Sequence, residues 1–182
     1  MPRNVGQVPL HHDVRAGGRR SVFWGDYTDG PTTPLWAFGH RLTYTRFEYG
    51  ALHVVSAGTT ADAVALVVPV TNTGARRGTE VVQLYVRDEV ASVPRPEQQL
   101  VGFTRVALDP GQSATVRFEV HPTRLAFYEE AMAFVTEPGA FTFSAGSSSN
   151  TAAAQAIVNL GGSVARYRQR EVVATAVTVT VA

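Results

Sequence analysis

The chain has 182 residues, of which 45% are hydrophobic, enough for one domain of ordinary size with a real core and an appendage. A net charge of +1 gives no reason to expect a nucleic-acid or anionic membrane partner, and no run of 18 apolar residues could span a bilayer. The absence of cysteine excludes disulfides and thiolate metal sites, and it leaves the redox compartment unreadable. The N-terminus also lacks the apolar core of a signal peptide, so the sequence does not indicate the cellular compartment.

The first forty residues hold too few periodic apolar positions to bury a core of their own. A short strand is predicted at residues 5–10, followed by a polar loop at 11–20 and a turn-rich stretch at 21–34 that contains Trp24 and Tyr27. We therefore expect an extended N-terminal arm that lies across the following domain or ends another one.

Alternating apolar and polar residues predict the strands that follow. Residues 35–52 lead into a first strand, and residues 62–71, 79–87, 100–108 and 113–120 predict further ones. Four alternating sets are expected to face the core: Val64, Leu66, Val68 and Val70; Val82, Leu84 and Val86; Ala114, Val116, Phe118 and Val120; and Phe141, Phe143 and Ala145.

Two features of these strands need comment. Pro69 cannot donate a backbone hydrogen bond, so we expect it at a sheet edge or a bulge, on the outward face. The strand at 100–108 has an ambiguous phase, because its apolar residues do not follow one alternation. The core is nevertheless expected to form around Leu84 and Val116, which lie at the centres of the two best alternating runs.

The second half of the chain continues with short strands and turns. Asp109-Pro110-Gly111 and Glu137-Pro138-Gly139 predict tight turns, and residues 122–127 predict a single helical turn. The last strands are expected at 140–146, 153–160 and 170–181. Since no amphipathic helix of ten or more residues is present, the pattern predicts an all-β, antiparallel β-sandwich with an N-terminal extended arm.

Several motifs then resemble one enzyme family. The linker sequence Ala37-Phe38-Gly39-His40-Arg41-Leu42-Thr43-Tyr44-Thr45-Arg46-Phe47-Glu48-Tyr49 is similar to the linker signature of family-3 glycoside hydrolases, close to PFGHGLSYTTFEY. Downstream, five segments resemble the fibronectin type III-like, immunoglobulin-like C-terminal domain of that family: Val70–Gly74, Glu80–Val86, Arg95-Pro96, Leu100–Phe103 and Glu137–Gly139. Upstream, Pro2–Pro9 resembles the last strand of the family's α/β sandwich domain.

The resemblance implies a division of the chain and its parent activity. Residues 1–40 would be the tail of the preceding α/β sandwich domain with the linker, and residues 41–182 the fibronectin type III-like domain. Family members are retaining exo-glycosidases, typically β-glucosidases or β-xylosidases. Their nucleophile lies in an N-terminal barrel and their acid/base residue earlier in the α/β domain. The chain would then be the C-terminal third or less of such an enzyme, with Met1 left by truncation or gene calling.

Departures from the family motif affect the linker locally. Arg41 stands where the family usually has glycine, Ala37 where proline is usual, and Thr43 where serine is usual. If that glycine adopts a positive φ, Arg41 would be strained by about 1 kcal/mol or more.

The candidate site residues are few, and none of them is expected to be catalytic. Asp26 and Asp29, beside Trp24 and Tyr27, could form a sugar-binding rim, since aromatic faces stack on sugar rings; alternatively the aspartates cap turns and the aromatic rings cover the core edge. Four residues mark the linker motif: Phe38, Gly39, His40 and Tyr44. His40 is expected to fix the linker against the sandwich by a hydrogen bond. No metal site or cofactor is expected.

Three functions remain open on this basis. The chain could be an accessory domain that braces the catalytic domains of a family-3 glycosidase, inactive by itself, with those domains as its partners and an oligosaccharide at the rim. It could instead be an independent carbohydrate-binding module, or a protein-binding β-sandwich. A carbohydrate module should show a row of exposed aromatic residues on one strand face, and the strands at 81–87 and 113–119 show none beyond Tyr85.

Overall fold

The computed structural model describes residue 13 and residues 33–182, in which thirteen short elements follow the linker. In chain order they are β1 (Phe47–Tyr49), β2 (His53–Ser56), β3 (Val64–Asn72), β4 (Gly78–Asp88), β5 (Gln99–Leu108), β6 (Ser113–Val120), η1 (Pro122–Arg124), β7 (Phe127–Tyr128), β8 (Phe134–Thr136), β9 (Gly139–Gly146), β10 (Ala154–Leu160), β11 (Ala165–Tyr167) and β12 (Ala176–Val181).

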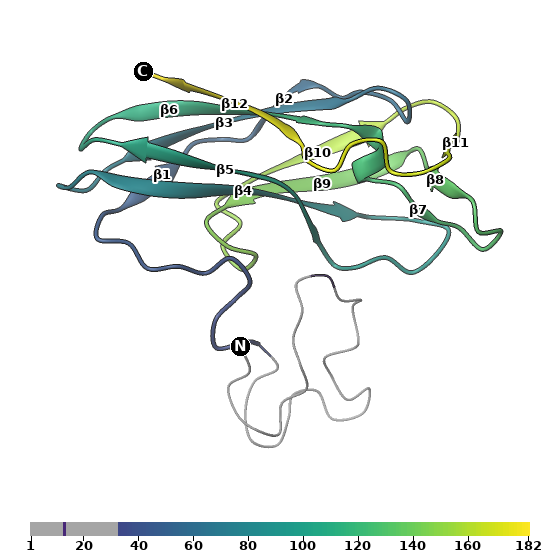
Figure 1. Ribbon diagram of the computed structural model, residues 1–182, viewed down its shortest axis with the longest axis horizontal. Helices are drawn as coiled ribbons and strands as arrows, with labels where there is room; N and C mark the ends of the chain where they lie inside the picture. Colours follow the sequence, from purple (N-terminus) through teal and green to yellow (C-terminus); the bar gives the residue numbers. More distant parts are fainter. Residues whose placement is uncertain (1–12, 14–32) are drawn as a thin grey trace.

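Two main antiparallel sheets lie face to face, as Figure 1 shows. One has the order β1-β3-β6-β12, with β2 also paired to β3, and the other has the order β10-β9-β4-β5. A small sheet of β11, β8 and β7 lies at one end. The predicted all-β sandwich is therefore confirmed. Within the described residues no helix is long and apolar enough to cross a membrane.

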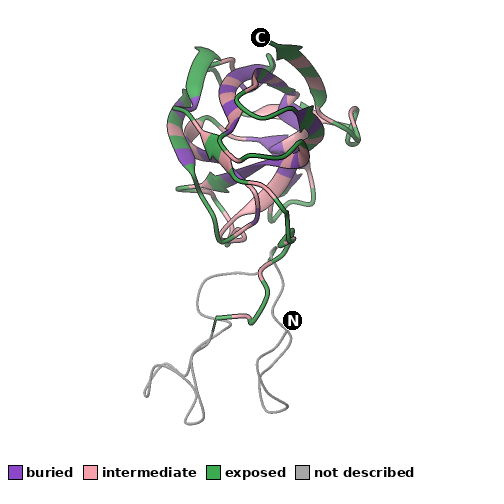
Figure 2. Ribbon diagram, turned by 90° about the vertical axis from the view of Figure 1, so that its left-hand side faces the viewer, coloured by how far each residue is buried: buried purple, intermediate pink, exposed green. Residues whose placement is uncertain are grey.

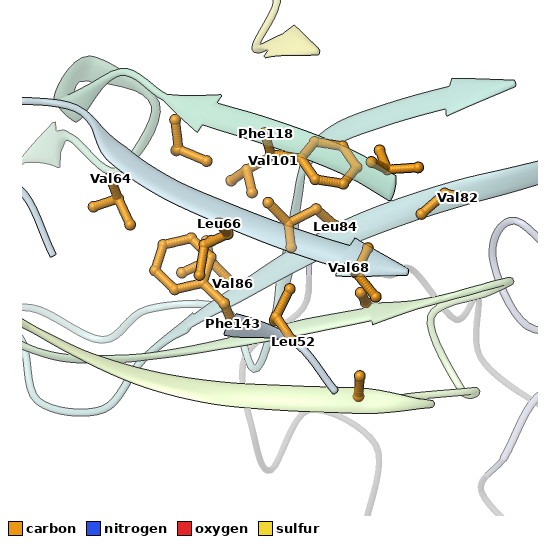
Figure 3. Packing of buried hydrophobic residues seen from close by; sticks show 14 of the residues in the cluster. Leu52, Val64, Leu66, Val68, Val82, Leu84, Val86, Val101, Phe118 and Phe143 are labelled. Atoms are coloured by element: carbon orange, nitrogen blue, oxygen red, sulfur yellow. The ribbon is translucent and has the colours of Figure 1, made fainter. Parts of the chain in front are cut away.

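The core lies between the two main sheets and uses the predicted alternating residues. The inward sets of β3, β4, β6 and β9 are all buried, and Leu84 and Val116 are fully so. Figure 3 shows the side chains of β3 and β4 meeting between the sheets, with Val101, Phe118 and Phe143 beside them. The predicted register is thus confirmed, because a one-residue slip would have turned Leu84 to the outer face.

The tight turn predicted at Asp109-Pro110-Gly111 and the helical turn are present, whereas the one predicted at Glu137-Pro138-Gly139 is not: residues 137 and 138 link β8 to β9 without a turn, and Gly139 is the first residue of β9. Gly111 has φ 77° and Gln112 N–H donates to Asp109 O at 3.0 Å, which closes the turn between β5 and β6. The helical turn at 122–124 is a short 3₁₀ helix.

Pro69 differs from the expectation. It lies on the outward face as predicted, but β3 is an internal strand with neighbours on both sides. Pro69 faces the break between β1 and β2, where Gly50 N–H donates to its carbonyl at 2.9 Å. A Cβ at Gly50 would lie 2.4 Å from the proline ring, so the chain passes Pro69 closely only because residue 50 is glycine. Pro69 lacks a backbone N–H, and the gap between β1 and β2 means that no strand residue opposite Pro69 needs that donor.

The ambiguous phase of β5 has a structural cause. The pairing of β4 with β5 shifts between Leu84 and Tyr85, which leaves Val101 as an extra residue in a β-bulge. Val101 is buried at the bulge itself. Beyond the bulge the buried residues are Val106 and Leu108, so the inward-facing positions change from odd to even residue numbers along β5. The last strand is also shorter than predicted, since β12 begins at Ala176 and residues 170–175 form no strand.

Candidate docking surface at the linker

The linker segment, residues 33–46, runs from the sandwich toward the N-terminal part of the chain. Figure 2 shows it leaving one side of the sandwich and exposed over most of its length. It is nevertheless fixed to the sandwich at defined points: the landmark Gly39 takes part in the first contact and Phe38 in the second.

Gln83 of β4 holds the linker segment by its side-chain amide. Its Nε2 lies 3.3 Å from Gly39 O and 2.6 Å from Ser147 O, and its Oε1 accepts a hydrogen bond from the Tyr85 hydroxyl at 2.6 Å. Gly39 has φ 76°, and a Cβ there would lie 2.0 Å from Gln83 Oε1. The close approach therefore requires glycine at position 39.

A second contact joins the same stretch of the linker to the loop after β9. Ser149 N–H donates to Phe38 O at 2.9 Å, and Gln98 Nε2 donates to Ser149 O at 2.6 Å. The linker segment, the loop at residues 147–150 and the start of β5 are thus connected by hydrogen bonds.

Arg41 fixes the end of the linker nearest to β1. Its Nη2 forms an ion pair with Glu80, a β4 residue whose side chain is 3% exposed, and its Nη1 donates to Thr79 O at 2.5 Å. The Tyr49 hydroxyl donates to the other Glu80 oxygen at 3.0 Å. Burial, reinforced by the charge of Glu80, raises the pKa of Tyr49, so this phenol stays protonated.

The strain expected at Arg41 is absent. Among the residues that the structure describes, Met132 is the only non-glycine residue with a positive φ. The linker takes its positive φ at Gly39, two residues earlier, and the arginine that replaces the family's usual glycine pairs with Glu80.

Asn72, in the motif Asn72-Thr73-Gly74, anchors the end of the linker from β3. It is fully buried; its Oδ1 accepts hydrogen bonds from Thr45 Oγ1 at 2.7 Å and from Gly74 N–H at 3.1 Å. Its Nδ2 donates to Arg76 O and Leu108 O. A buried amide is stable here because its donors and its acceptor are all paired.

Apolar side chains are exposed along the fixed linker. Trp36 and Phe38 are each 45% exposed, Leu42 is 85% exposed and Tyr44 is 96% exposed. On the neighbouring strand β5, Phe103 is 62% exposed. We call the set Leu35, Trp36, Phe38, Leu42, Tyr44 and Phe103 the docking surface. Exposed apolar patches are typical of contact sites for proteins, membranes or ligands.

An apolar groove lies within the docking surface. It has a volume of about 260 Å³ and is lined by Phe38, Gly39, Arg41, Val81, Gln83, Leu100 and Phe103. Its walls come from both the linker and the outer face of β4 and β5, so its shape depends on the hydrogen bonds of Gln83.

The two other landmarks have different surroundings. The His40 ring stacks on Trp36 with centroids 4.5 Å apart, and its backbone N–H donates to Ala37 O at 3.1 Å. Tyr44, in contrast, extends into solvent. The proposed rim residues Trp24, Asp26, Tyr27 and Asp29 lie outside the described residues, and their role stays a prediction.

Residues that the sequence patterns passed over turn out to hold the linker. The alternation that turns Val82, Leu84 and Val86 inward places Gln83 and Tyr85 on the outer face of β4, yet they are only 4% and 2% exposed. Burial raises the pKa of the Tyr85 phenol to about 12. Glu80 is equally buried.

Exposed aromatic residues do not form a row along any strand that the structure describes. They are Trp36, Phe38, Tyr44, Phe103 and Tyr128, and four of the five belong to the docking surface. This distribution fits contact with a second protein surface better than a flat platform for a polysaccharide chain.

Comparison with known proteins agrees with this architecture. The fibronectin type III-like domain family matches residues 80–149. A β-xylosidase of Formosa agariphila is 42% identical over 154 residues, which cover 82% of this chain and 21% of that protein. A periplasmic β-glucosidase of Salmonella typhimurium is 36% identical over 148 residues, which cover 78% of this chain and 19% of that protein.

Solved structures give the same result. A β-glucosidase from Erythrobacter marinus superimposes with a TM-score of 0.81 and 36% identity, covering 88% of this chain and 21% of that one. A GH3 β-glucosidase from Bifidobacterium adolescentis gives 0.64 and 35%, covering 68% and 18%. The chain thus spans about a fifth of the length of these relatives. From its fold, its linker motif and these matches, the chain belongs to the family-3 glycoside hydrolases, as their fibronectin type III-like C-terminal portion.

Proposed function

We propose that this chain is the accessory domain of a family-3 exo-β-glycosidase of the β-glucosidase or β-xylosidase type. In this proposal it braces the catalytic domains, which dock on the linker and on Phe103, and it contributes neither the nucleophile nor the acid/base residue. The division at residue 40 between the α/β domain with its linker and the sandwich is part of the same proposal.

One observation carries the proposal: Gln83 and Arg41 lock a linker whose apolar side chains remain exposed. A free hinge would need no buried ion pair, and a free-standing module would gain nothing from Leu42 and Tyr44 in water. A locked linker with an apolar outer surface instead fixes the orientation of whatever precedes it. Burying apolar surface there contributes roughly 25 cal/mol per Å².

A chimera tests the docking role. The segment of the Formosa agariphila β-xylosidase that aligns with this chain is replaced by the corresponding residues of this chain. We expect the chimera to hydrolyse an aryl β-xyloside and to resist thermal inactivation nearly as well as its parent. Phe103→Ala should lower the inactivation temperature of the chimera, because Phe103 lies on the docking surface.

Tyr128→Ala is the matched control, since Tyr128 is a similarly exposed aromatic residue, 57% exposed, on the distant strand β7. Both variants are also made in the isolated chain, so that any loss of intrinsic stability can be subtracted. An equal effect of the two substitutions after that subtraction would contradict docking at Phe103.

The isolated chain supplies the second test. We expect it to turn over neither aryl β-glucosides nor aryl β-xylosides, and to show no binding in titrations with xylan, cellulose or short glucosides. Turnover would overturn the accessory role, and saturable binding of a polysaccharide would favour an independent carbohydrate-binding module.

A further inference from the structure

The loop at residues 89–97, between β4 and β5, is held to the sandwich around one buried acidic residue and one buried basic residue. Asp88, at the end of β4, has a side chain that is 6% exposed, and Arg95, within the loop, has one that is 10% exposed. Figure 1 shows this connection passing beside β7 and β8. Residues 87–97 enclose a hollow of about 480 Å³.

Arg95 ties the loop to two other segments. Its Nη2 donates to Gln99 Oε1 at 3.0 Å and to Leu125 O at 3.2 Å. Its guanidinium carbon lies 4.3 Å from the centre of the Phe127 ring, a cation–π contact. Opening the loop would therefore break contacts to β5, to the chain after η1 and to β7.

Asp88 is poorly compensated in its charged form. Its Oδ2 lies 3.8 Å from Arg95 Nε, too far for a hydrogen bond, and both atoms are buried without a hydrogen-bond partner. The Val90 N–H is a favourable contact, whereas the charges of Glu89 and Glu137 oppose ionisation of Asp88. Glu137 belongs to the same assembly, since its Oε2 accepts the Ser92 N–H at 3.0 Å.

Two further charged groups lie around this pair. Arg87 forms an ion pair with Glu89 at 3.4 Å in which both side chains are partly exposed, and the charge of Asp13 acts on Arg95. The described charges that act on Asp88 itself are those of Arg95, Glu137 and Glu89. Burial disfavours the charged carboxylate of Asp88 more than the positive charge of Arg95 favours it. The pKa of Asp88 is therefore raised to about 6.

We propose that Asp88 and Arg95 form a proton-sensitive lock that holds loop 89–97 more tightly on the sandwich under mildly acidic conditions. The closed loop buries Asp88, whereas an open loop returns its carboxyl group to water and to an ordinary pKa. The closed state then binds a proton more strongly than the open state. Acidification through pH 6 favours closure, and the gain is complete near the ordinary pKa of aspartate. This inference is independent of the proposed accessory function.

Amide hydrogen exchange on the full 182-residue chain measures the lock directly. After correction for the intrinsic exchange rate, we expect protection of residues 89–97 to be about tenfold greater at about pH 5 than at about pH 7. This factor follows from a pKa of Asp88 of about 6 in the closed state and of 3.8 in the open state. Equal protection at the two pH values would overturn the proposal.

Asp88→Asn is uncharged at every pH, so its protection in the loop should no longer change with pH. The matched control is Asp109→Asn, because Asp109 is an exposed aspartate in the turn after β5, and this variant should behave as the wild type. A pH dependence that persists in Asp88→Asn would assign the effect to another carboxylate and reject the lock.

The carboxyl carbon of Asp88 in the wild-type chain provides a measurement that does not depend on the folding of a variant. Its NMR shift should titrate with a midpoint near pH 6. A midpoint near the ordinary value of about 4 would reject the proposal even if Asp88→Asn failed to fold.

Discussion

The side-chain Nε2 of Gln83 lies 3.3 Å from the carbonyl oxygen of Gly39, and in the same position it reaches Ser147 O at 2.6 Å. One residue of β4 therefore joins the linker and the loop after β9. Since Tyr85 donates to its Oε1, the amide is paired at both ends inside a buried site. The orientation of the linker follows from this arrangement more than from the flexibility of its own backbone.

Gln83→Leu keeps the volume of the side chain and removes all three hydrogen bonds. The Gly39 and Ser147 carbonyls and the Tyr85 hydroxyl lose their partner, and the expected loss in the free energy of unfolding is about 2–4 kcal/mol. Denaturant unfolding measures it. Gln155→Leu, the same change at an exposed position of β10, should stay within about 0.5 kcal/mol; equal losses would show that Gln83 does not hold the linker.

Arg41→Met leaves Glu80 buried without its counter-ion. Because Arg41 itself is 23% exposed, the expected destabilisation is about 2–3 kcal/mol, below the usual figure for fully buried pairs. The double variant Arg41→Met with Glu80→Leu should recover much of this loss in a double-mutant cycle. Arg117→Met breaks an ion pair with Glu119 that is exposed, and its cost should be below about 1 kcal/mol.

Leu84→Ala removes a fully buried side chain from the centre of the core. The lost transfer free energy and the remaining cavity together should cost roughly 2–5 kcal/mol in thermal or denaturant unfolding. Ile157→Ala makes a comparable truncation at a side chain that is 67% exposed and should cost far less. A denaturation midpoint unchanged by Leu84→Ala would contradict the register of β4.

Met132 adopts φ 59° at the tip of the β7–β8 hairpin, where its side chain is 74% exposed. A methionine pays a conformational penalty there that asparagine largely avoids, and little packing is lost by the exchange. Met132→Asn should therefore raise the free energy of unfolding by about 0.5–1 kcal/mol. Ala131→Asn, at an adjacent exposed residue without positive φ, serves as the control and should give no gain.

Alkaline solution should destabilise the sandwich through its buried tyrosines. The pKa of Tyr85 is about 12, whereas the phenol of the unfolded chain ionises near 10. The unfolded state then loses its proton first, so the free energy of unfolding falls as pH rises from about 10 to about 12. Tyr85→Phe should reduce this slope, with Tyr49 supplying part of the remainder. Denaturant unfolding at several pH values measures the slope, and an identical slope in the variant would contradict the shift.

Local residue patterns were enough to predict the inward-facing residues of the core strands and the turn between β5 and β6, but not the extended link between β8 and β9, where Glu137-Pro138-Gly139 predicted a turn. Alternation in β3, β4, β6 and β9 predicted which residues face inward, because a strand turns successive side chains to opposite faces whatever surrounds it. The turn at Asp109-Pro110-Gly111 was equally predictable, since proline and glycine restrict φ locally. The linker motif and the downstream segments likewise indicate the family, because they are carried by the identity and order of neighbouring residues.

Tertiary structure alone decided how the outer face of β4 is used. Nothing local to Gln83 shows that Gly39, 44 residues earlier, and Ser147, 64 residues later, meet at its amide. In the same way the bulge at Val101 sets the phase of β5, and the break opposite Pro69 lets a proline occupy an internal strand. Whether a polar residue is buried depends on which distant segment covers it, and the alternation of a single strand carries no information about that segment.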